Sequence, residues 1–399
     1  MQRRNLLSLA SLILAGMIPA GPAVAAEKPI KIGAVAPKTG PLAGGAAVTQ
    51  WPTIKLWVSD VNGRGGLKMK DGTRRTIELV EYDDRTNPGE TIKAVERLAT
   101  VDKADFIIAP YGTGLNLASA PVFAKYGYPQ IAVSAITDKT GELAKRYPGI
   151  FFTLGNTTAF AQSVADILAQ MVKDGKIGKR VAMVNVADAF GIELAEAARP
   201  IFKKAGLEIV YDKSYPLGAQ DLASVVKGAK AATPDAFVAW SYPPDTFGLT
   251  ELAKIEGLNV KAFYTAVATC FPAYAGKFQA SAENVLGAGG INVDAAELAG
   301  YFDRHQKVTG VGADYWAGPV TYASLQVLEQ SIEAVGTDRA AVTNHIKSGS
   351  FKTVLGDWKF NNQVIDQFWT VGQWQGGKFV GVASTGKTGA KSVQVKTGW

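Results

Sequence analysis

Short apolar runs alternate with segments of helical periodicity along most of the chain from residue 30. The runs Ile30–Val35 and 105–108 are typical of buried strands, whereas the segment 90–99 places Ile92, Val95 and Leu98 on one helical face. The pattern predicts strands at 30–35, 76–82, 105–108, 130–133, 150–153, 180–184, 207–210 and 236–240, and helices at 54–62, 90–99, 160–172, 191–204 and 221–231.

This strand–helix alternation favours parallel sheets that are covered by helices on both faces. The series restarts near residue 155, which indicates two such layered units rather than one oversized sheet. A closed eight-fold barrel is the structural alternative, but the segment after Asp357 is rich in strand formers and tryptophan, unlike a final barrel helix. The sequence therefore predicts an α/β protein with two doubly wound lobes.

The N-terminus has the pattern of a secretory signal peptide. Arg3 and Arg4 precede an apolar run at 6–18, and small residues follow at 23–26. A retained membrane anchor is the alternative, but the run is shorter than the ~20 residues of a membrane span. No lipid-attachment cysteine precedes the predicted cleavage, since the only cysteine is Cys270. We predict cleavage of residues 1–26 and a soluble periplasmic protein.

Composition narrows the class of protein further. One cysteine cannot form an internal disulfide, so Cys270 is interpreted as a small buried apolar residue and stability must come from a large core. Without Arg3 and Arg4, 40 basic residues stand against 35 acidic ones, and the lysines are scattered along the chain. This scatter argues against a nucleic-acid-binding stripe.

The segment Gly381–Thr388 matches the phosphate-loop pattern G-x-x-x-x-G-K-[ST]. A phosphate loop needs a following helix, whereas here Gly389 follows at once and the last residues carry no helical stripe. We interpret this segment as a flexible tail and not as a nucleotide site.

Residues for acid–base or metal chemistry are few. His305 and His345 lie in helical, polar-flanked segments, which predicts surface histidines and neither a zinc site nor a catalytic triad. The pair Asp83–Asp84 is interpreted as structural, with an acid capping the helix that begins after Pro88. No metal, cofactor or catalytic residue is predicted.

In open α/β sheets ligands bind beyond the carboxyl ends of the strands, so the loops there are the candidate site. Hydroxyls and backbone N–H groups in these loops would hold a polar group such as a carboxylate, and aromatic rings would enclose an apolar body. The hydroxyls are Thr113, Ser134, Thr137 and Ser241, and the aromatic residues are Tyr111, Phe190, Trp240, Tyr242 and Tyr264.

An ordered series of motifs runs along nearly the whole chain after the signal peptide. It includes 32–35 leading to Gly40-Pro41-Leu42, Asn62-Gly63-Arg64-Gly65-Gly66, 80–84 with Asn87-Pro88, Asp188-Ala189-Phe190-Gly191 and the helix at 322–328. With this series the chain resembles the type I periplasmic solute-binding proteins of branched-chain amino acid ABC transporters. The resemblance implies two lobes joined by a three-segment hinge, with lobe one at 27–154 plus 288–362 and lobe two at 155–287 plus 363–399.

The resemblance also implies a site. The loops matching Gly112–Thr113 and Ser134-Ala135-Ile136-Thr137 bind the ligand carboxylate in family members, and the aromatic residue matching Phe190 closes from lobe two. Amino-acid binders carry a glutamate near the position of Val267 to neutralise the ligand ammonium, and the stretch 155–158 has no acid either. Because a buried ammonium without a counter-charge costs several kcal/mol, an organic acid without the amine is predicted, and the aromatic lining favours an aromatic one.

The leading hypothesis is therefore a monomeric periplasmic receptor that binds a small organic acid between its lobes and delivers it to a membrane permease. Catalysis, cofactors and nucleic acid play no part in it. The alternatives are a branched-chain or other amino-acid receptor, a ligand-sensing protein, and an exported α/β hydrolase using Thr113 or Ser241, for which the sequence offers no base.

Overall fold

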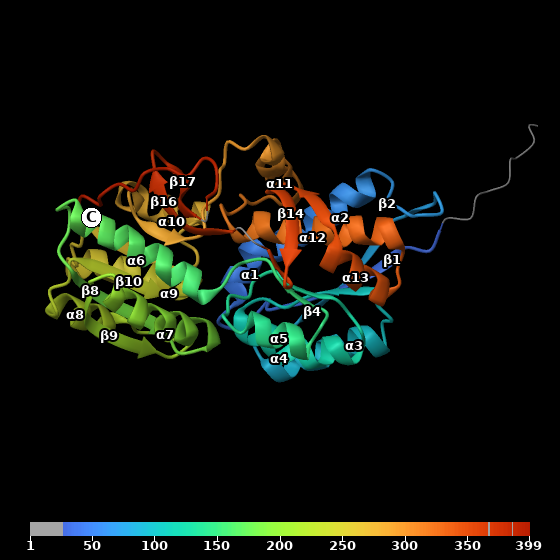
Figure 1. Ribbon diagram of the computed structural model, residues 1–399, viewed down its shortest axis with the longest axis horizontal. Coiled ribbons are helices and arrows are strands. Elements are labelled where there is room, and N and C mark those ends of the chain that lie inside the picture. Colours follow the sequence, from blue (N-terminus) through green and yellow to red (C-terminus); the bar gives the residue numbers. More distant parts are fainter. Residues whose placement is uncertain (1–26, 366–367, 385) are drawn as a thin grey trace, which may run out of the picture.

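The computed structural model describes residues 27–365, 368–384 and 386–399. The predicted signal peptide, residues 1–26, lies outside the described residues. Two α/β lobes lie side by side along the long axis of the molecule (Figure 1). The predicted α/β class and two-lobed fold are confirmed.

Lobe one has its strands between two groups of helices, with α2 and α12 on one side and α3, α4 and α5 on the other (Figure 1). Its strands are β1 (Ile30–Ala36), β2 (Leu67–Lys68), β3 (Arg74–Arg75), β4 (Ile77–Asp83), β5 (Phe106–Ile108), β6 (Gln130–Ala132), β7 (Ile150–Phe152), β13 (Ser350–Thr353), β14 (Gly356–Asn361) and β15 (Val364–Ile365). Its helices are α1 (Ala43–Thr49), α2 (Trp51–Gly63), α3 (Pro88–Thr100), α4 (Thr113–Lys125), α5 (Thr140–Arg146), α11 (Tyr301–Thr309), α12 (Ala317–Val335) and α13 (Arg339–Ser348), with the short 3₁₀ helix η2 (Ala296–Leu298) before α11.

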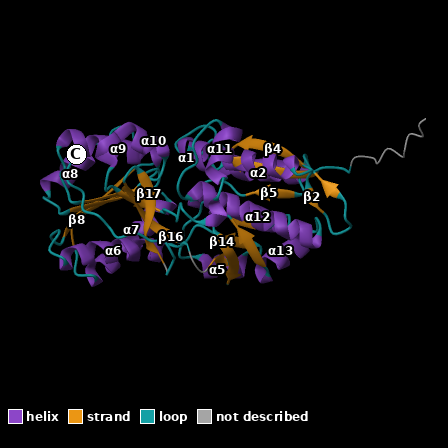
Figure 2. Cartoon of the chain, turned by 90° about the horizontal axis from the view of Figure 1, so that it is seen from above, coloured by secondary structure: helices purple, strands orange, loops and turns teal. Residues whose placement is uncertain are grey.

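Lobe two is a seven-stranded sheet in the order β17-β16-β12-β11-β10-β8-β9, with α8, α9 and α10 on one face and α6 and α7 on the other (Figure 2). Its strands are β8 (Arg180–Val186), β9 (Glu208–Tyr215), β10 (Ala236–Trp240), β11 (Ala262–Thr265), β12 (Leu286–Ala288), β16 (Trp369–Gln375) and β17 (Lys378–Ser384). Its helices are α6 (Thr157–Lys173), α7 (Ala189–Lys204), α8 (Ala223–Ala231), α9 (Pro243–Glu256) and α10 (Pro272–Phe278), which η1 (Gln279–Ala282) follows.

The inner strands of both lobes are parallel, and almost every residue of β1 and β10 is buried. This burial on both faces explains their near-continuous apolar sequence. The final strands β16 and β17 instead pair antiparallel to the edge of lobe two, as the change of pattern after Asp357 suggested.

The chain passes between the lobes after β7, after β12 and after β15. Apart from the last crossing, we keep the predicted lobe boundaries as a proposal. Val364 pairs with Phe152 of β7, which favours placing the last crossing after residue 365 rather than after residue 362.

Three local predictions were wrong: the surface position of His305, the cap of α3 and the flexible C-terminal tail. His305 is fully buried, with Nδ1 3.0 Å from the carbonyl oxygen of Val311, and burial lowers its pKa. His345 is partly buried, with Nδ1 3.1 Å from Ser331 Oγ. Their polar sequence neighbours lie on other faces of the same helices, so the polarity of the flanking residues did not predict how exposed the histidine side chains are.

The cap of α3 is also not an aspartate. Asn87 Oδ1 accepts the N–H of Glu90 at 3.1 Å and caps the helix, which begins at Pro88 itself. Asp83 instead accepts the N–H groups of Lys38 and Arg85, each at 2.8 Å, and so ties two loops together.

The C-terminal segment after residue 385 is held against lobe two rather than flexible. Gln373 bonds to both the N–H and the carbonyl of Gln394, and Trp399 Nε1 donates to the carbonyl of Leu258 at 2.9 Å. The Trp399 ring packs edge-on against Phe263 with centroids 4.8 Å apart. Since β17 pairs antiparallel to β16 and residues 386–399 contain no helix, the phosphate-loop geometry is absent from this described segment.

Within the described residues no helix is both long and apolar enough to cross a membrane.

Candidate ligand-binding site

The strand order of each lobe has a switch point at its carboxyl edge. In lobe one β1 lies between β4 and β5, and in lobe two β8 lies between β9 and β10. The connections that follow β1 and β8 therefore run to one side of the sheet, and those that follow β5 and β10 run to the other. Such a switch point opens a ligand crevice beyond the strand ends. In lobe one the loop after β5 forms it, and in lobe two the loops after β8 and β10 do.

Gly112 makes the turn from β5 into α4 in lobe one. Its φ of 92° and ψ of 149° belong to a region that is open essentially only to glycine. Its N–H donates to Ser134 Oγ at 2.9 Å, so this group holds the neighbouring loop. Thr113 begins α4, and the first N–H groups of a helix have no partner within it and carry a partial positive charge. An anion is therefore favoured in front of this turn.

The predicted hydroxyls of lobe one serve to hold its two loops together. Ser134 Oγ donates to the carbonyl of Pro110 at 3.1 Å, and Thr113 Oγ1 accepts the N–H of Ile136 at 3.1 Å. Ala135 and Ile136 are buried between these bonds. The loops at 110–113 and 134–137 are thus one rigid unit.

Tyr111 is buried, with its hydroxyl against the backbone of α1. A Cβ added at Gly45 would lie 2.2 Å from the Tyr111 hydroxyl oxygen, so only glycine lets this ring pack here. Burial raises the pKa of Tyr111, and the nearby Asp314 and Cys270 add to the rise.

An aromatic pair lies at the strand ends of lobe two. The rings of Phe190 and Tyr242 have centroids 4.8 Å apart, and both side chains are buried. The Tyr242 hydroxyl donates to Asp188 Oδ2 at 3.1 Å, while Asp188 Oδ1 caps α7 by accepting the N–H of Gly191 at 3.0 Å. Burial raises the pKa of Asp188 and places that of Tyr242 well above its usual value.

The remaining predicted residues of lobe two lie at the ends of β10 and β11. Ser241 Oγ lies 2.7 Å from Thr246 Oγ1, and the N–H of Val267 donates to the carbonyl of Ser241 at 3.0 Å. Trp240 packs edge-on against Tyr264 with centroids 5.3 Å apart. Among the described residues, no protein group bonds the buried Trp240 Nε1 or the buried Tyr264 hydroxyl, so both donors could bond to a ligand that reaches them.

The strand-end loops of the two lobes lie against each other. A Cβ added at Gly112 would lie 3.6 Å from the Tyr242 hydroxyl, and one added at Gly114 would lie 4.0 Å from Ala189 Cβ at the start of α7. Thr137 Oγ1 donates to Glu193 Oε2 of α7 at 2.6 Å. The structure therefore brings Gly112, Thr137, Phe190 and Tyr242 together between the lobes, whereas the named contacts of Ser241 and Val267 stay within lobe two.

A second contact between the lobes was not predicted. Asp314 is fully buried before α12 and accepts the N–H groups of Trp316 at 3.0 Å and Gly318 at 2.7 Å. The Cys270 thiol of lobe two lies 3.9 Å from Asp314 Oδ2, and the N–H of Tyr315 donates to the Cys270 carbonyl at 3.2 Å. Burial raises the pKa of Asp314 to about 6. An acid just before an apolar helix is a capping signal that the sequence did contain.

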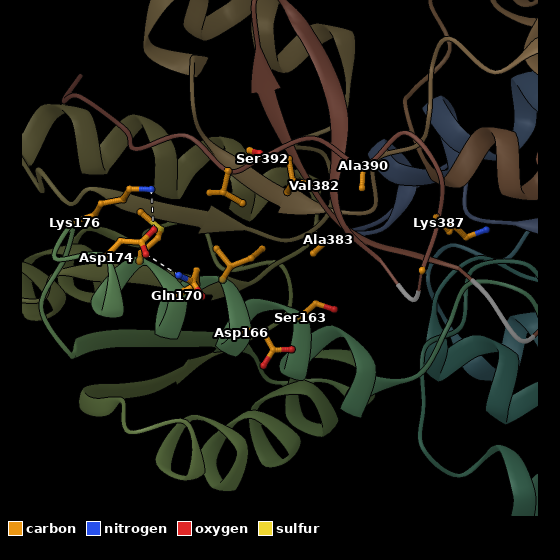
Figure 3. Close-up of a pocket in the computed structure, with 14 residues that line it drawn as sticks. Ser163, Asp166, Gln170, Asp174, Lys176, Val382, Ala383, Lys387, Ala390 and Ser392 are labelled. Carbon is orange, nitrogen blue, oxygen red and sulfur yellow. Dashed lines mark hydrogen bonds and ion pairs between the residues drawn. The ribbon is translucent and has the colours of Figure 1, made fainter.

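Figure 3 shows a cavity of about 710 Å³ elsewhere in lobe two. It lies between the α6 residues Asp166 and Gln170 and the C-terminal residues Val382 and Ser392. None of the predicted ligand residues lines it. In the described part of the chain no cluster of three or more His, Cys, Asp or Glu side chains is placed to hold a metal ion.

Comparison with known proteins decides the family. A model of the periplasmic binding protein family matches residues 29–378. The chain belongs to the periplasmic binding protein family. The resemblance to this family is thus confirmed, and so is the prediction that the protein is not an enzyme, because the family consists of non-catalytic substrate-binding proteins. Its members bind small solutes and work with ABC transporter permeases.

Relatives of this periplasmic binding protein differ in their ligands. Leu/Ile/Val-binding protein homolog 7 of Brucella suis biovar 1 (strain 1330) is 25% identical over 396 residues, covering 94% of this chain and 95% of that protein. The structure of Streptococcus pneumoniae LivJ with isoleucine matches with a TM-score of 0.76 at 20% identity, covering 92% and 99% of the two chains. A solute-binding protein of R. palustris with benzoate matches with a TM-score of 0.77 at 19% identity, covering 91% and 99%. At these identities the two solved structures establish the shared fold.

Proposed function

We propose that this protein is the substrate-binding component of an ABC importer and that it binds a small carboxylate-bearing solute, preferably aromatic, between its two lobes. One observation carries the proposal. The N-terminus of α4 at Gly112–Thr113 lies next to the aromatic pair Phe190–Tyr242 of the other lobe, where a Cβ added at Gly112 would be 3.6 Å from the Tyr242 hydroxyl. An anion acceptor on one side and flat rings on the other suit an aromatic acid.

The charges near this site support an acid without an ammonium group. Asp188 is occupied by the N–H of Gly191 and the Tyr242 hydroxyl, and Asp314 by the N–H groups of Trp316 and Gly318. Glu193 is occupied by Thr137 and Lys139. Val267 supplies no charge to the lobe-two loop. A ligand ammonium would have to compete with these donors or remain unpaired, and an unpaired buried ammonium costs several kcal/mol.

Two buried donors of lobe two that lack a protein partner among the described residues favour a ligand with an acceptor group. Trp240 Nε1 and the Tyr264 hydroxyl are buried, and a buried polar group without a bond costs about 1–3 kcal/mol. A bound solute with an acceptor such as a ring hydroxyl would satisfy them. The benzoate complex of the R. palustris neighbour favours this ligand class, whereas the Brucella relative's name favours an amino acid.

We further propose that the protein acts as a monomer in the periplasm after cleavage of residues 1–26, and that closure of the lobes couples ligand binding to docking on the permease.

A thermal-shift panel on the mature protein tests the ligand class, because a ligand stabilises the state that binds it. Benzoate, hydroxybenzoates, aliphatic carboxylates, leucine, isoleucine and valine form the panel. We expect the largest rise in melting temperature with an aromatic or aliphatic carboxylate. A larger rise with a branched-chain amino acid than with every other compound would contradict the proposal.

A further inference from the structure

Three consecutive residues of lobe one, Thr137, Asp138 and Lys139, each bond to lobe two. Asp138 accepts the N–H and the hydroxyl of Thr158 at 3.0 Å and 2.6 Å. Thr158 lies at the start of α6, directly after the first crossing between the lobes, so this contact belongs to the hinge. The partner of Thr137 and Lys139 is Glu193, which lies on α7 and away from the crossing.

Glu193 is held entirely from the opposite lobe. Its Oε2 accepts the Thr137 hydroxyl at 2.6 Å and its Oε1 accepts Lys139 Nζ at 2.9 Å. The Glu193 side chain is 11% exposed, so water competes little for the carboxylate, whereas that of Lys139 is 57% exposed. Hydrogen bonds to a charged and largely buried group are among the stronger ones in proteins.

This arrangement changes the role of Thr137. A hydroxyl has one hydrogen to donate, and Thr137 donates it to Glu193 while its oxygen accepts the N–H of Lys139 at 3.2 Å. Thr137 was predicted to bind the ligand directly. That role stays a prediction, and in this structure its hydroxyl donates to Glu193 across the lobes, at the end of the rigid loop that contains Ser134 and Ile136.

We propose that Glu193 is the latch of the closed state: by holding Thr137 and Lys139 it keeps the lobes closed and sets ligand affinity without touching the ligand. The inference rests on the proposed binding function. Opening must break both Glu193 bonds, whereas the Asp138–Thr158 contact at the crossing can persist. Glu193 is therefore a positioning residue, and its substitution raises the dissociation rate of the ligand more than it changes the association rate.

The protein carries its own reporter of opening. Cys270 is the only cysteine of the chain, it is fully buried, and its thiol faces Asp314 across the lobes. Separation of the lobes removes the cover that the Asp314 segment gives the thiol, so we expect a small maleimide to label the ligand-free protein faster when the lobes open more often. This measurement requires no knowledge of the ligand.

The test compares Glu193→Gln with a matched control, Glu251→Gln. The control removes the same charge from an ion pair within lobe two, where Lys277 Nζ lies 2.6 Å from Glu251 Oε2. We expect Glu193→Gln to label Cys270 about tenfold faster than wild type, as loss of one charged hydrogen bond implies, and Glu251→Gln to label at the wild-type rate. Lys139→Met, which removes the other half of the latch from lobe one, accelerates labelling in the same direction and covers the case in which Glu193→Gln folds poorly.

Wild-type labelling rates in both Glu193→Gln and Lys139→Met overturn the latch, as does equal acceleration in Glu251→Gln. When a carboxylate ligand has been found, stopped-flow binding adds a readout that a general loss of stability would not change. In Glu193→Gln the dissociation rate of that ligand is expected to rise about tenfold, while its association rate stays within about threefold of wild type. Failure of the proposed function is a separate result, in which no carboxylate slows the labelling of wild-type Cys270.

Discussion

Two glycines of one loop, Gly112 and Gly114, provide a matched test of the turn that faces the ligand. Gly112 has φ 92° and ψ 149°, a conformation that costs an alanine on the order of 1–3 kcal/mol. Its new Cβ would lie 3.0 Å from Leu42 Cδ1, closer than ordinary contact, and 3.6 Å from the Tyr242 hydroxyl. Gly114 lies within α4, and its Cβ would meet only Ala189 Cβ at 4.0 Å.

Gly112→Ala is therefore expected to lower the free energy of unfolding by about 1–3 kcal/mol, whereas Gly114→Ala leaves it unchanged or raises it by up to about 1 kcal/mol through helix propensity. Urea denaturation of the mature variants measures both values. Because the glycine turn also sets where the first N–H groups of α4 point, Gly112→Ala is expected to weaken binding of the best carboxylate of the panel by about tenfold or more, which corresponds to about 1.4 kcal/mol. Equal stability of the two variants, or an unaltered affinity in Gly112→Ala, would refute this reading of the turn.

Three further changes test separate parts of the fold. Asn87→Ala removes the cap of α3 and is expected to cost about 1 kcal/mol in chemical denaturation, with a loss below about 0.3 kcal/mol counting against the cap. Burial raises the pKa of Asp314 from 3.8 to about 6, so between these pH values the folded protein holds a proton that the unfolded chain has released. The free energy of unfolding therefore falls by about 3 kcal/mol from this group as the pH rises from about 4 to about 6. Asp314→Asn should flatten this dependence in melting curves recorded across that pH range. Trp399→Ala loses the packing on Phe263 and the bond to Leu258 and should cost about 1–3 kcal/mol, whereas an unchanged melting curve would show that the C-terminal residues do not stabilise lobe two.

Features that depend on local pattern could be predicted from the sequence. The apolar run Ile30–Val35 became the buried central strand of lobe one, and the stripe of Ile92, Val95 and Leu98 lies on α3, whose Val95 and Leu98 are buried. The hydrophobic periodicity and the apolar runs were enough to predict these elements, because a parallel strand and an amphipathic helix bury their apolar residues wherever they lie in the fold.

Features that depend on contacts between distant segments could not be predicted. Nothing near Thr137 in the sequence indicates that its hydroxyl bonds to Glu193, which is 56 residues away. The burial of Asp314 against Cys270 likewise arises only when the lobes meet. His305 shows the same limit within one helix, since its polar neighbours suggested a surface that the packing of α11 on α2 does not leave open.

The central claim is that the site holds a carboxylate and provides no partner for an α-ammonium group. Calorimetric titration of the mature protein with acid pairs that differ only in that group tests it most directly: 4-methylpentanoate against leucine, and 3-phenylpropanoate against phenylalanine. In each pair we expect the acid without the amine to bind at least about tenfold more tightly, a difference of about 1.4 kcal/mol. Tighter binding of leucine or phenylalanine than of its deaminated partner would contradict it.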